Sequence, residues 1–499
     1  MKKLSPLLIS VLIALILFLP GCTTKASNTG EGLFKQAQVE QEQGNFVTAK
    51  DLYNQAQEKL TAEGNSELAA ECGRNRQNMD IIAMTYPIKE DDMRQMLERE
   101  FPQVAEDIRE SWIEDGKLER TRIDGEMYYF GQVIANIKFR NTDLFQQDAT
   151  MMSHYEQGYL KLKAIMDEGN GDPWQPFIRP VTIKGNAKFA IPRDKLPQAG
   201  LFKVWLPIPI ITGPQPNVEV TSITPGVYVK NPPSIDQDIG LIYMEVPLDE
   251  LGTDLNIDIQ FTFDHYEQRF QIDPTRIGDY DQESELYKQY TKSSENTTIT
   301  TDIRDTAVRV VGDESNPYLA AKIIYDYVIK NITYSFMPHP ALWPRGETES
   351  EYVHNNRYGD CGAQSMYFSA LCRAIGIPAR TTGGWQLFSG NFAGHFWAEF
   401  FIPEYGWIPA DPTAATLVDY LSGVSDADKQ SFHDFYFANQ DHLRCNVQKD
   451  VDVALIPPAE QSVFLPMAIQ EPAMLCDGMD QAALAELLEY WSMTAQGAK

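Results

Sequence analysis

Three residues in the last third of the chain, Cys361, His395 and Asp411, have the types and the order that thiol catalysis requires. Cys361 follows a Gly-Asp turn and precedes the run GAQSMYFSALCRA, in which apolar residues recur with helical spacing. We expect a helix that ends near Ala374, with the thiol at or next to its N-terminus. There, unpaired N–H groups and the helix dipole favour a thiolate, and the same N–H groups can bind an oxyanion. Cys361 is therefore the candidate nucleophile.

His395 and Asp411 supply the base and the orienting group that a cysteine nucleophile needs. His395 begins one strand-like run, HFWAEFFI, and Asp411 ends the next, GWIPAD, with a turn at EYGW. If these runs pair as a hairpin, the carboxylate of Asp411 can accept the far imidazole N–H and fix the tautomer of His395. We therefore predict that the hairpin turns both side chains toward the helix end that carries Cys361.

The other cysteines, histidines and tryptophans of this region have simpler interpretations. Cys372 lies three turns into the same helix on its apolar side, which is typical of a core residue. The tryptophans are expected to pack in the core, although Trp397 is close enough to His395 to form a wall of the site. The remaining histidines have no comparable partner pattern, and we expect them to be structural: His339, His354, His433 and His442.

The combination of motifs resembles the transglutaminase-like superfamily. GDC contains Cys361, GHFWAEFF contains His395, ADPT contains Asp411, and GIPAR lies between the first two motifs. A helix that ends in NITYSF precedes them, and the resemblance covers residues 303–450. It implies a papain-like core in which Cys361 is the nucleophile, His395 the general base and acid, and Asp411 the orienting group. Members of the family include transglutaminases, cysteine proteases, peptide:N-glycanases and some inactive relatives.

The resemblance also implies a side chain, commonly Gln or an aromatic residue, that precedes the cysteine and completes the oxyanion hole. No Gln lies between Trp343 and Cys361, so Trp343, Tyr352 and Tyr358 are the candidates. Asp360 opposes thiolate formation if its carboxylate turns toward the thiol. The sequence has no EF-hand loop and no clustered Cys/His spacing, so we predict no metal and no cofactor.

The order of helix-like and strand-like runs along the chain predicts an α+β multidomain protein, in which an N-terminal helical region and an all-β sandwich precede the papain-like transglutaminase core. The first helices resemble one tetratricopeptide repeat, and we expect them to dock either another domain or a protein partner. In the next region, EMYYFGQVIANIKF is strand-like. The predicted segments are a signal peptide (1–22), a polar tether (23–32), a tetratricopeptide-like hairpin (33–85), an α+β region (86–175), the β-sandwich (178–272), the catalytic core (300–460) and a C-terminal helical segment (461–499).

The first 22 residues form a targeting signal. Lys2 and Lys3 precede an uncharged run, Leu7 to Leu19, that is too short to span a bilayer comfortably. The end of the signal, LPGC, resembles the lipobox of prokaryotic lipoproteins, in which the cysteine is acylated; an ordinary secretory signal is the alternative. We therefore expect lipidation of Cys22 and an extracytoplasmic body that is anchored to the cell membrane, on its periplasmic or cell-surface side.

Charge and cysteine count restrict the partners and the redox state. The formal net charge of −28 repels phosphate backbones, which argues against a nucleic-acid partner. If Cys22 is lipidated, five cysteines remain, and an odd number in an exported protein leaves at least one free thiol. Whether Cys445 and Cys476 form a disulfide is a question that the sequence leaves open.

These features predict a membrane-anchored thiol enzyme that acts on an amide bond of a protein or peptide through an acyl-enzyme. Hydrolysis needs no second substrate site, so we favour a cysteine protease or amidase over a transglutaminase that passes the acyl group to an amine. The alternative from another class is a surface module that binds a peptide in the groove, or assembles partners, without turnover.

Overall fold

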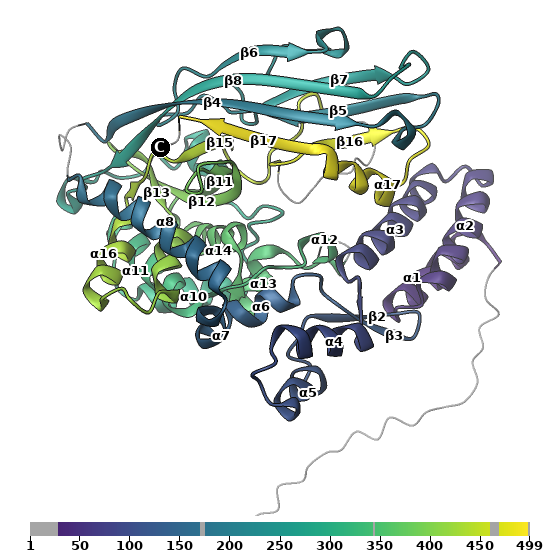
Figure 1. The fold of residues 1–499 in the computed structure, drawn as a ribbon, viewed down its shortest axis with the longest axis horizontal. Coiled ribbons are helices and arrows are strands. Elements are labelled where there is room, and N and C mark those ends of the chain that lie inside the picture. The colour runs from purple at the N-terminus through teal and green to yellow at the C-terminus, as the bar shows by residue number, and fades with distance from the viewer. Residues whose placement is uncertain (1–27, 170–174, 343–344, 460–468, 498–499) are drawn as a thin grey trace, which may run out of the picture. The chain divides into compact units, whose positions relative to one another are not determined.

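The computed structural model describes residues 28–169, 175–342, 345–459 and 469–497 (Figure 1). The chain divides into two units, one that ends at Arg76 and one that runs from Gln77 to Lys499. Cys22, and with it the predicted lipobox, lies outside the described residues. None of the helices in the described ranges is long and apolar enough to cross a membrane.

The first unit is helical, as its sequence predicts. Small residues let its first two helices approach closely, since Ala37, Ala49 and Ala56 are fully buried. The turn between these helices contains Gly44, whose positive φ of 78° suits glycine. The likeness to a tetratricopeptide repeat stays a prediction. The helices are α1 (Gly30–Glu42), α2 (Phe46–Ala62) and α3 (Ser66–Thr85), of which α3 continues past Arg76.

The second unit begins with a small sheet, order β1-β3-β2, followed by helices. The strand predicted for EMYYFGQVIANIKF ends at Tyr129, and its second half is helix α6. Tertiary contacts hold this helix: the Asn136 side chain donates to the Phe336 carbonyl oxygen (3.0 Å) and accepts from the Phe336 N–H (2.8 Å). The elements are β1 (Ile88–Lys89), α4 (Glu90–Glu100), α5 (Glu106–Glu114), β2 (Arg120–Ile123), β3 (Glu126–Tyr129), α6 (Val133–Phe139), α7 (Thr142–Gln147) and α8 (Ala149–Asp167).

Each of the five β-rich runs between residues 181 and 272 contains a strand. The strands form two sheets together with three strands from later in the chain, β14 (Asn439–Gln440), β16 (Ala473–Cys476) and β17 (Trp491–Gln496). One sheet has the order β14-β8-β4-β17, with β6 paired to β8, and the other has the order β16-β5-β7. Alternate residues of β4 and β8 are buried, and they share one hydrophobic core with residues of β5 and β7. The strands are β4 (Phe177–Ile191), β5 (Leu201–Pro207), β6 (Glu219–Thr224), β7 (Leu241–Pro247) and β8 (Leu255–Arg269).

The C-terminal segment differs from the predicted helical segment. Within residues 469–497, which the structure describes, the helical parts are α17 (Gln481–Glu486) and a short 3₁₀ turn, whereas β16 (Ala473–Cys476) pairs with β5 and β17 (Trp491–Gln496) pairs with β4. The Trp491 ring packs edge-to-face on Phe189 of β4, with 5.9 Å between centroids. Residues 481–490 of DQAALAELLEYWSM are thus helical, as predicted, whereas its last residues, from Trp491, pair with the free edge of β4. Cys445 and Cys476 are both buried free thiols and do not form a disulfide.

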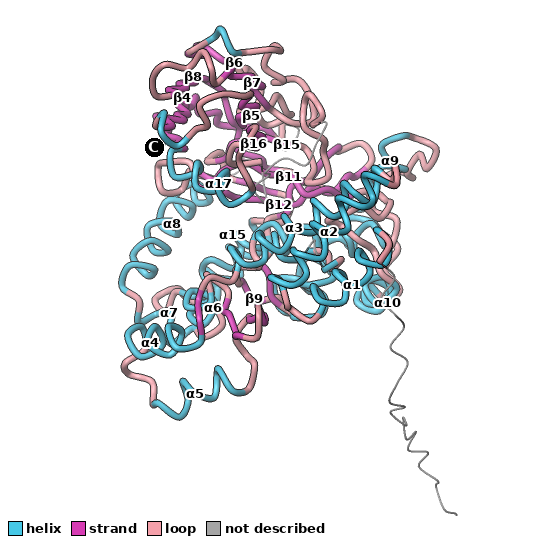
Figure 2. Tube along the Cα trace, turned by 90° about the vertical axis from the view of Figure 1, so that its right-hand side faces the viewer, coloured by secondary structure: helices cyan, strands magenta, loops and turns pink. Residues whose placement is uncertain are grey.

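The region predicted as the catalytic core packs helices on a four-stranded sheet with the order β13-β12-β11-β15. Both views show β11, β12 and β15 between the helices and the strands of the β-rich region (Figures 1 and 2). The strands are β9 (Thr333–Tyr334), β10 (Tyr358–Gly359), β11 (Ala379–Gln386), β12 (Ala393–Ile402), β13 (Gly406–Ala410), β14 (Asn439–Gln440) and β15 (Arg444–Gln448). The helices are α9 (Glu285–Tyr290), α10 (Thr301–Val311), α11 (Pro317–Asn331), α12 (His339–Leu342), α13 (Glu349–Asn356), α14 (Cys361–Ala374), α15 (Pro412–Thr416) and α16 (Asp426–Phe435).

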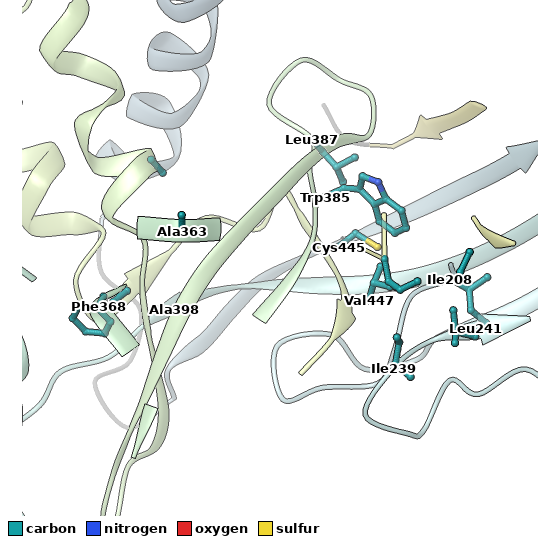
Figure 3. Close-up of a cluster of buried hydrophobic side chains, with 14 of the residues drawn as sticks. Ile208, Ile239, Leu241, Ala363, Phe368, Trp385, Leu387, Ala398, Cys445 and Val447 are labelled. Carbon is teal, nitrogen blue, oxygen red and sulfur yellow. The ribbon is translucent and has the colours of Figure 1, made fainter. Parts of the chain in front are cut away.

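Apolar side chains from the two sheet systems lie against each other. In Figure 3, Ile208 and Leu241 of the β-rich region lie near Cys445 and Val447 of β15. Main-chain bonds reinforce this contact, since the Gly240 N–H donates to the Val447 carbonyl oxygen (2.8 Å). The β-rich region therefore supports β15, the strand at one edge of the catalytic sheet.

Candidate active site

Helix α14 begins at Cys361, as predicted, because Asp360 caps it. The Asp360 Oδ1 atom accepts a hydrogen bond from the Ala363 N–H (3.1 Å), and the Cys361 side chain remains partly exposed. Burial and the charge of Asp360 raise the pKa of the thiol above its ordinary value, against a smaller lowering by the Phe396 and Gly362 N–H groups. The resting site therefore holds a thiol rather than the thiolate that the helix end alone would favour, and this proton must leave during any nucleophilic attack.

Strand β12 brings a main-chain N–H group to the sulfur. The Phe396 N–H hydrogen-bonds to Cys361, and Phe396 directly follows His395 in the strand. On the neighbouring strand β11, Gly383 pairs with Phe396, and a Cβ atom at Gly383 would lie 2.1 Å from the Phe396 ring. Glycine at this position therefore lets the ring cross β11, which holds the His395–Phe396 segment against the thiol.

His395 and Asp411 form a buried pair, with 2.8 Å between Nε2 and Oδ2. The predicted hairpin is present: β12 and β13 pair antiparallel, with Ala398 opposite Ala410, so Asp411 follows directly from the paired strand. Burial raises the pKa of Asp411, but the charges of His395 and Arg444 outweigh it and hold this pKa well below its ordinary value. Asp411 is therefore an anion that fixes the imidazole, and Nδ1 is the ring nitrogen that can exchange a proton with the thiol.

Arg444 on β15 is a partner of Asp411 that the sequence does not single out. Its Nη1 atom donates to Asp411 Oδ2 (2.6 Å), while Nε and Nη2 donate to Asp441 Oδ2 (3.0 and 2.7 Å). Arg444 and Asp441 are 0% exposed and Asp411 is 1% exposed. The guanidinium thus joins two buried carboxylates and keeps Asp411 ionised and in place beside His395.

Cys361 and His395 line one cavity of about 460 Å³, which also contains Thr413 from α15. Much of its wall is aromatic and comes from outside the strands and helix that carry the predicted triad. Two of these aromatic residues, Phe139 on α6 and Tyr155 on α8, belong to the region that precedes the β-rich strands. The Tyr420 hydroxyl donates to the Phe139 carbonyl oxygen (3.2 Å), which ties that region to the core. The aromatic wall consists of Phe139, Tyr155, Tyr334, Phe336, Phe388 and Tyr420.

A second cavity, of about 430 Å³, meets the first at Cys361. The two cavities share Tyr334, Phe336, Cys361 and Gly394. The lining of the second is mostly apolar, with side chains such as Met366 and Leu455, but it also includes His339 and two carboxylates. The thiol therefore stands where two separate spaces adjoin.

The residues predicted for the oxyanion hole and the site wall lie at different places in the structure. Trp397 is completely buried and stacks on the His395 ring, with 6.1 Å between centroids, so it supports the base from behind. Tyr358 lines neither cavity, and the Arg140 guanidinium covers its ring at 3.6 Å. Trp343 lies outside the described residues. Among the tyrosines, Tyr334 lines both cavities together with Cys361.

Tyr334, the tyrosine of NITYSF, is positioned by the pairing of β9 with β10. Its Cα partner is Gly359, two residues before Cys361, and the Ser335 N–H donates to the Gly359 carbonyl oxygen (3.1 Å). Burial, and then the proximity of Cys361 and Asp360, raise the pKa of Tyr334 far above its ordinary value. The hydroxyl therefore stays protonated and can donate a hydrogen bond to an oxyanion formed at Cys361.

Tyr334→Phe is expected to lower kcat roughly 100-fold with little change in KM, because it removes one oxyanion donor and no substrate contact in the ground state. Steady-state kinetics of the acyl-transfer reaction checks this. Tyr358→Phe is the matched control, since it removes a hydroxyl from a tyrosine of the adjoining strand that lines neither cavity, and its kcat should stay near the wild-type value. Equal kcat values for the two variants would exclude Tyr334 from the oxyanion hole.

Among the other histidines, for which a structural role stays a prediction, His339 stands out because it has two carboxylate partners. Its Nε2 atom lies 2.6 Å from Asp360 Oδ2 and its Nδ1 atom 3.2 Å from Glu349 Oε1. His354 bonds to the Tyr367 hydroxyl (3.0 Å) and His433 to Asp419 (3.0 Å), and neither lines the cavities at Cys361. His339 is thus a second buried histidine near the candidate nucleophile; it lines the second cavity, whereas His395 lines the first.

Comparisons with known proteins concern the same segment of the chain. Residues 304–412 match the transglutaminase-like superfamily. A protein-glutamine gamma-glutamyltransferase of Pseudomonas aeruginosa is 30% identical over 105 residues, which are 19% of this chain and 15% of the relative. An uncharacterized protein of Haemophilus influenzae is 26% identical over 156 residues, 26% of this chain and 42% of the relative. The chain therefore covers less than half of either relative.

One solved structure, from Cytophaga hutchinsonii, is described as that of a candidate cysteine protease. It is 16% identical in sequence to this chain and superposes with a TM-score of 0.34. The match covers 47% of this chain and 78% of the chain in that structure. The family match begins in α10 and ends just after Asp411, so it contains Cys361 at the start of α14, His395 on β12 and the end of β13. Residues 304–412 are therefore a transglutaminase-like domain.

Proposed function

We propose that the protein is a thiol enzyme that cleaves amide bonds of proteins or peptides, as a cysteine protease or amidase. One observation carries the proposal: Cys361, at the start of α14, lines the same cavity as His395, which is hydrogen-bonded to the buried carboxylate of Asp411. A nucleophile, a base and an orienting group in one cavity are the parts that acyl transfer through a covalent intermediate requires.

In the proposed reaction, His395 Nδ1 takes the thiol proton as the Cys361 sulfur attacks the amide carbonyl carbon. The C–S bond forms, and the carbonyl oxygen becomes an oxyanion that the N-terminal N–H groups of α14 and the Tyr334 hydroxyl can stabilise. The imidazolium then gives its proton to the amide nitrogen as the C–N bond breaks, and an amine leaves. His395 then takes a proton from water as the water oxygen attacks the thioester carbon; the C–S bond breaks, the acyl group leaves as a carboxylic acid, and the imidazolium returns the proton to the sulfur. Throughout, Asp411 holds the imidazole in one tautomer.

Acyl transfer to an amine is the second candidate, and a specific feature favours it. The second cavity at Cys361 gives room for an acceptor while the acyl group occupies the first. The relative from Pseudomonas aeruginosa, which matches over 19% of this chain, is named as a glutamyltransferase. A module that only binds peptides is the third possibility, and the paired His395 and Asp411 argue against it.

The proposed setting is extracytoplasmic. A lipid on Cys22 would anchor the protein to the membrane surface, where it would meet proteins or peptides of the cell envelope. The helices of the first unit would then be available to a protein partner. These proposals rest on the signal sequence and on the tetratricopeptide-like pattern at residues 33–85.

One experiment distinguishes the three functions. The full chain, purified in mild detergent, is incubated with a library of glutamine-containing peptides, with and without a primary amine, and the products are analysed by mass spectrometry. We expect new peptide termini or conversion of glutamine to glutamate, because water resolves the acyl-enzyme. Attachment of the amine would identify a transglutaminase, and unchanged peptides that co-purify with the protein would identify a binding module. His395→Gln is the control, and it should remove every covalent product.

A further inference from the structure

A second charged cluster lines the second cavity at Cys361, the one that does not include His395. His339 stands between two carboxylates, with 2.6 Å from Nε2 to Asp360 Oδ2 and 3.2 Å from Nδ1 to Glu349 Oε1. His339 and Glu349 are 1% exposed and Asp360 is 6% exposed. All three line the second cavity together with Cys361. Three ionisable groups are thus buried within contact of one another, next to the candidate nucleophile.

Asp360 connects this cluster to the thiol, since it is bonded to Cys361 in the chain and uses its two oxygens differently. Oδ1 accepts from the Ala363 N–H (3.1 Å) and caps α14, while Oδ2 faces His339. The helix needs an oxygen acceptor at this position, and a carboxylate supplies it with a negative charge. A bare buried anion one residue from the nucleophile would oppose formation of the thiolate.

The charges around His339 determine the protonation state of its imidazole. Burial disfavours the imidazolium, but the charge and hydrogen bond of Asp360, followed by those of Glu349, outweigh burial and raise the pKa of His339 to about 10. Conversely, His339 and the N–H groups of Ala363 and Gly362 hold the pKa of Asp360 below its ordinary value despite burial. The other titratable groups near the thiol include Tyr334 and Tyr155, whose pKa values are raised mainly by burial so that both stay neutral, and Asp411 with its partner His395.

We propose that His339 is a positioning residue that acts through Asp360: its imidazolium neutralises the capping carboxylate, so that the Cys361 thiolate forms beside an ion pair instead of beside a bare anion. The proposal rests on the thiol chemistry proposed above and adds a second histidine to it. The site then has two imidazoles with separate tasks. His395 exchanges the proton of the thiol, whereas His339 keeps its own proton and sets the electrostatic potential at the sulfur.

The test is the pH profile of Cys361 alkylation by iodoacetamide, read by mass spectrometry in the full chain and in three variants. His339→Gln leaves the Asp360 charge without its counter-charge, so the thiol pKa rises, thiolate needs a higher pH, and labelling below the midpoint falls roughly tenfold. Asp360→Asn removes the charge and keeps a good cap, so the midpoint should not rise. The double variant His339→Gln/Asp360→Asn has neither charge, and its profile should return close to that of the wild type.

Rescue by the double variant is the decisive result, because a purely structural role for His339 predicts none. The proposal fails if the double variant shares the raised midpoint of His339→Gln, or if His339→Gln labels with the wild-type midpoint. Thermal unfolding shows which variants are folded; should His339→Gln not fold, a raised midpoint in Asp360→Asn or in a folded double variant would still contradict the proposal. Peptide turnover by the wild type is measured separately. If the wild type shows no turnover but the alkylation midpoints of the variants follow the expected order, the proposed function is refuted and the role of His339 is not.

Discussion

Cys361→Ala is expected to abolish covalent turnover of any peptide substrate, by roughly 10⁴-fold or more, while the protein keeps its wild-type stability. The thiol is partly exposed at the first position of α14, and the cap made by Asp360 does not depend on the sulfur. Removing it therefore deletes the nucleophile and little packing. The measurement is product formation from the peptide library together with the thermal midpoint of unfolding.

Cys372→Ala is the matched control, since it makes the same change in the same helix. Cys372 is completely buried in the hydrophobic core, and burial raises the pKa of its thiol far above the ordinary value. We expect about 1 kcal/mol less stability from the small cavity, with turnover preserved. If Cys361→Ala kept its turnover, or if Cys372→Ala lost turnover while folded, Cys361 would not be the nucleophile.

Arg444→Met is expected to reduce the free energy of unfolding by about 3–5 kcal/mol, because it leaves two buried carboxylates without their shared cation. Asp411 and Asp441 both bind Arg444, and all three side chains are completely or almost completely buried. The fraction that folds should also lose activity. Without the guanidinium, the pKa of Asp411 rises toward its ordinary value, and the carboxylate loses one of the contacts that fix it opposite His395.

Denaturant unfolding measures the first effect, and turnover per folded molecule measures the second. Arg380→Met is the control, because Arg380 also forms a buried ion pair in the same sheet, with 2.8 Å from Nε to Glu399 Oε2, but lies outside both cavities. It should lose stability of similar size and keep its activity when folded. Loss of activity in both variants to the same degree would show that Arg444 matters for folding only.

The parts of the site that the sequence predicts are those encoded locally. A capped helix start at Cys361 follows from the Gly-Asp turn and the apolar periodicity of the next fourteen residues, because both features act within one helix. The His395–Asp411 pair follows from a short hairpin, in which chain distance fixes spatial distance. The strands between residues 178 and 272 are predictable for the same reason, since the alternation of apolar and polar residues within each run specifies a strand.

The parts that the sequence does not predict depend on contacts between distant segments. His339 has no motif around it, and its partners lie 10 and 21 residues away on α13 and at the cap of α14. Arg444 reaches Asp411 across 33 residues, and Phe139 reaches the cavity from a helix that reads as a strand. For Tyr334 a signal is present, since NITYSF belongs to the family resemblance, but Tyr334 precedes the stretch from Trp343 to Cys361 in which an oxyanion donor is expected.

Helices α6 and α8 contribute part of the wall of the cavity at Cys361. The reacting groups and this part of the wall therefore come from different segments of the chain, although such properties are usually encoded together. The reacting groups lie within residues 304–412, whereas Phe139 and Tyr155 lie more than a hundred residues earlier, outside the family match. A fragment cut at the family boundaries would contain the chemistry and lack part of the surface that meets the substrate. If the proposed function is right, substitutions in the earlier segment can change which substrate is accepted without altering the reacting groups, and two relatives with identical reacting groups can differ in substrate.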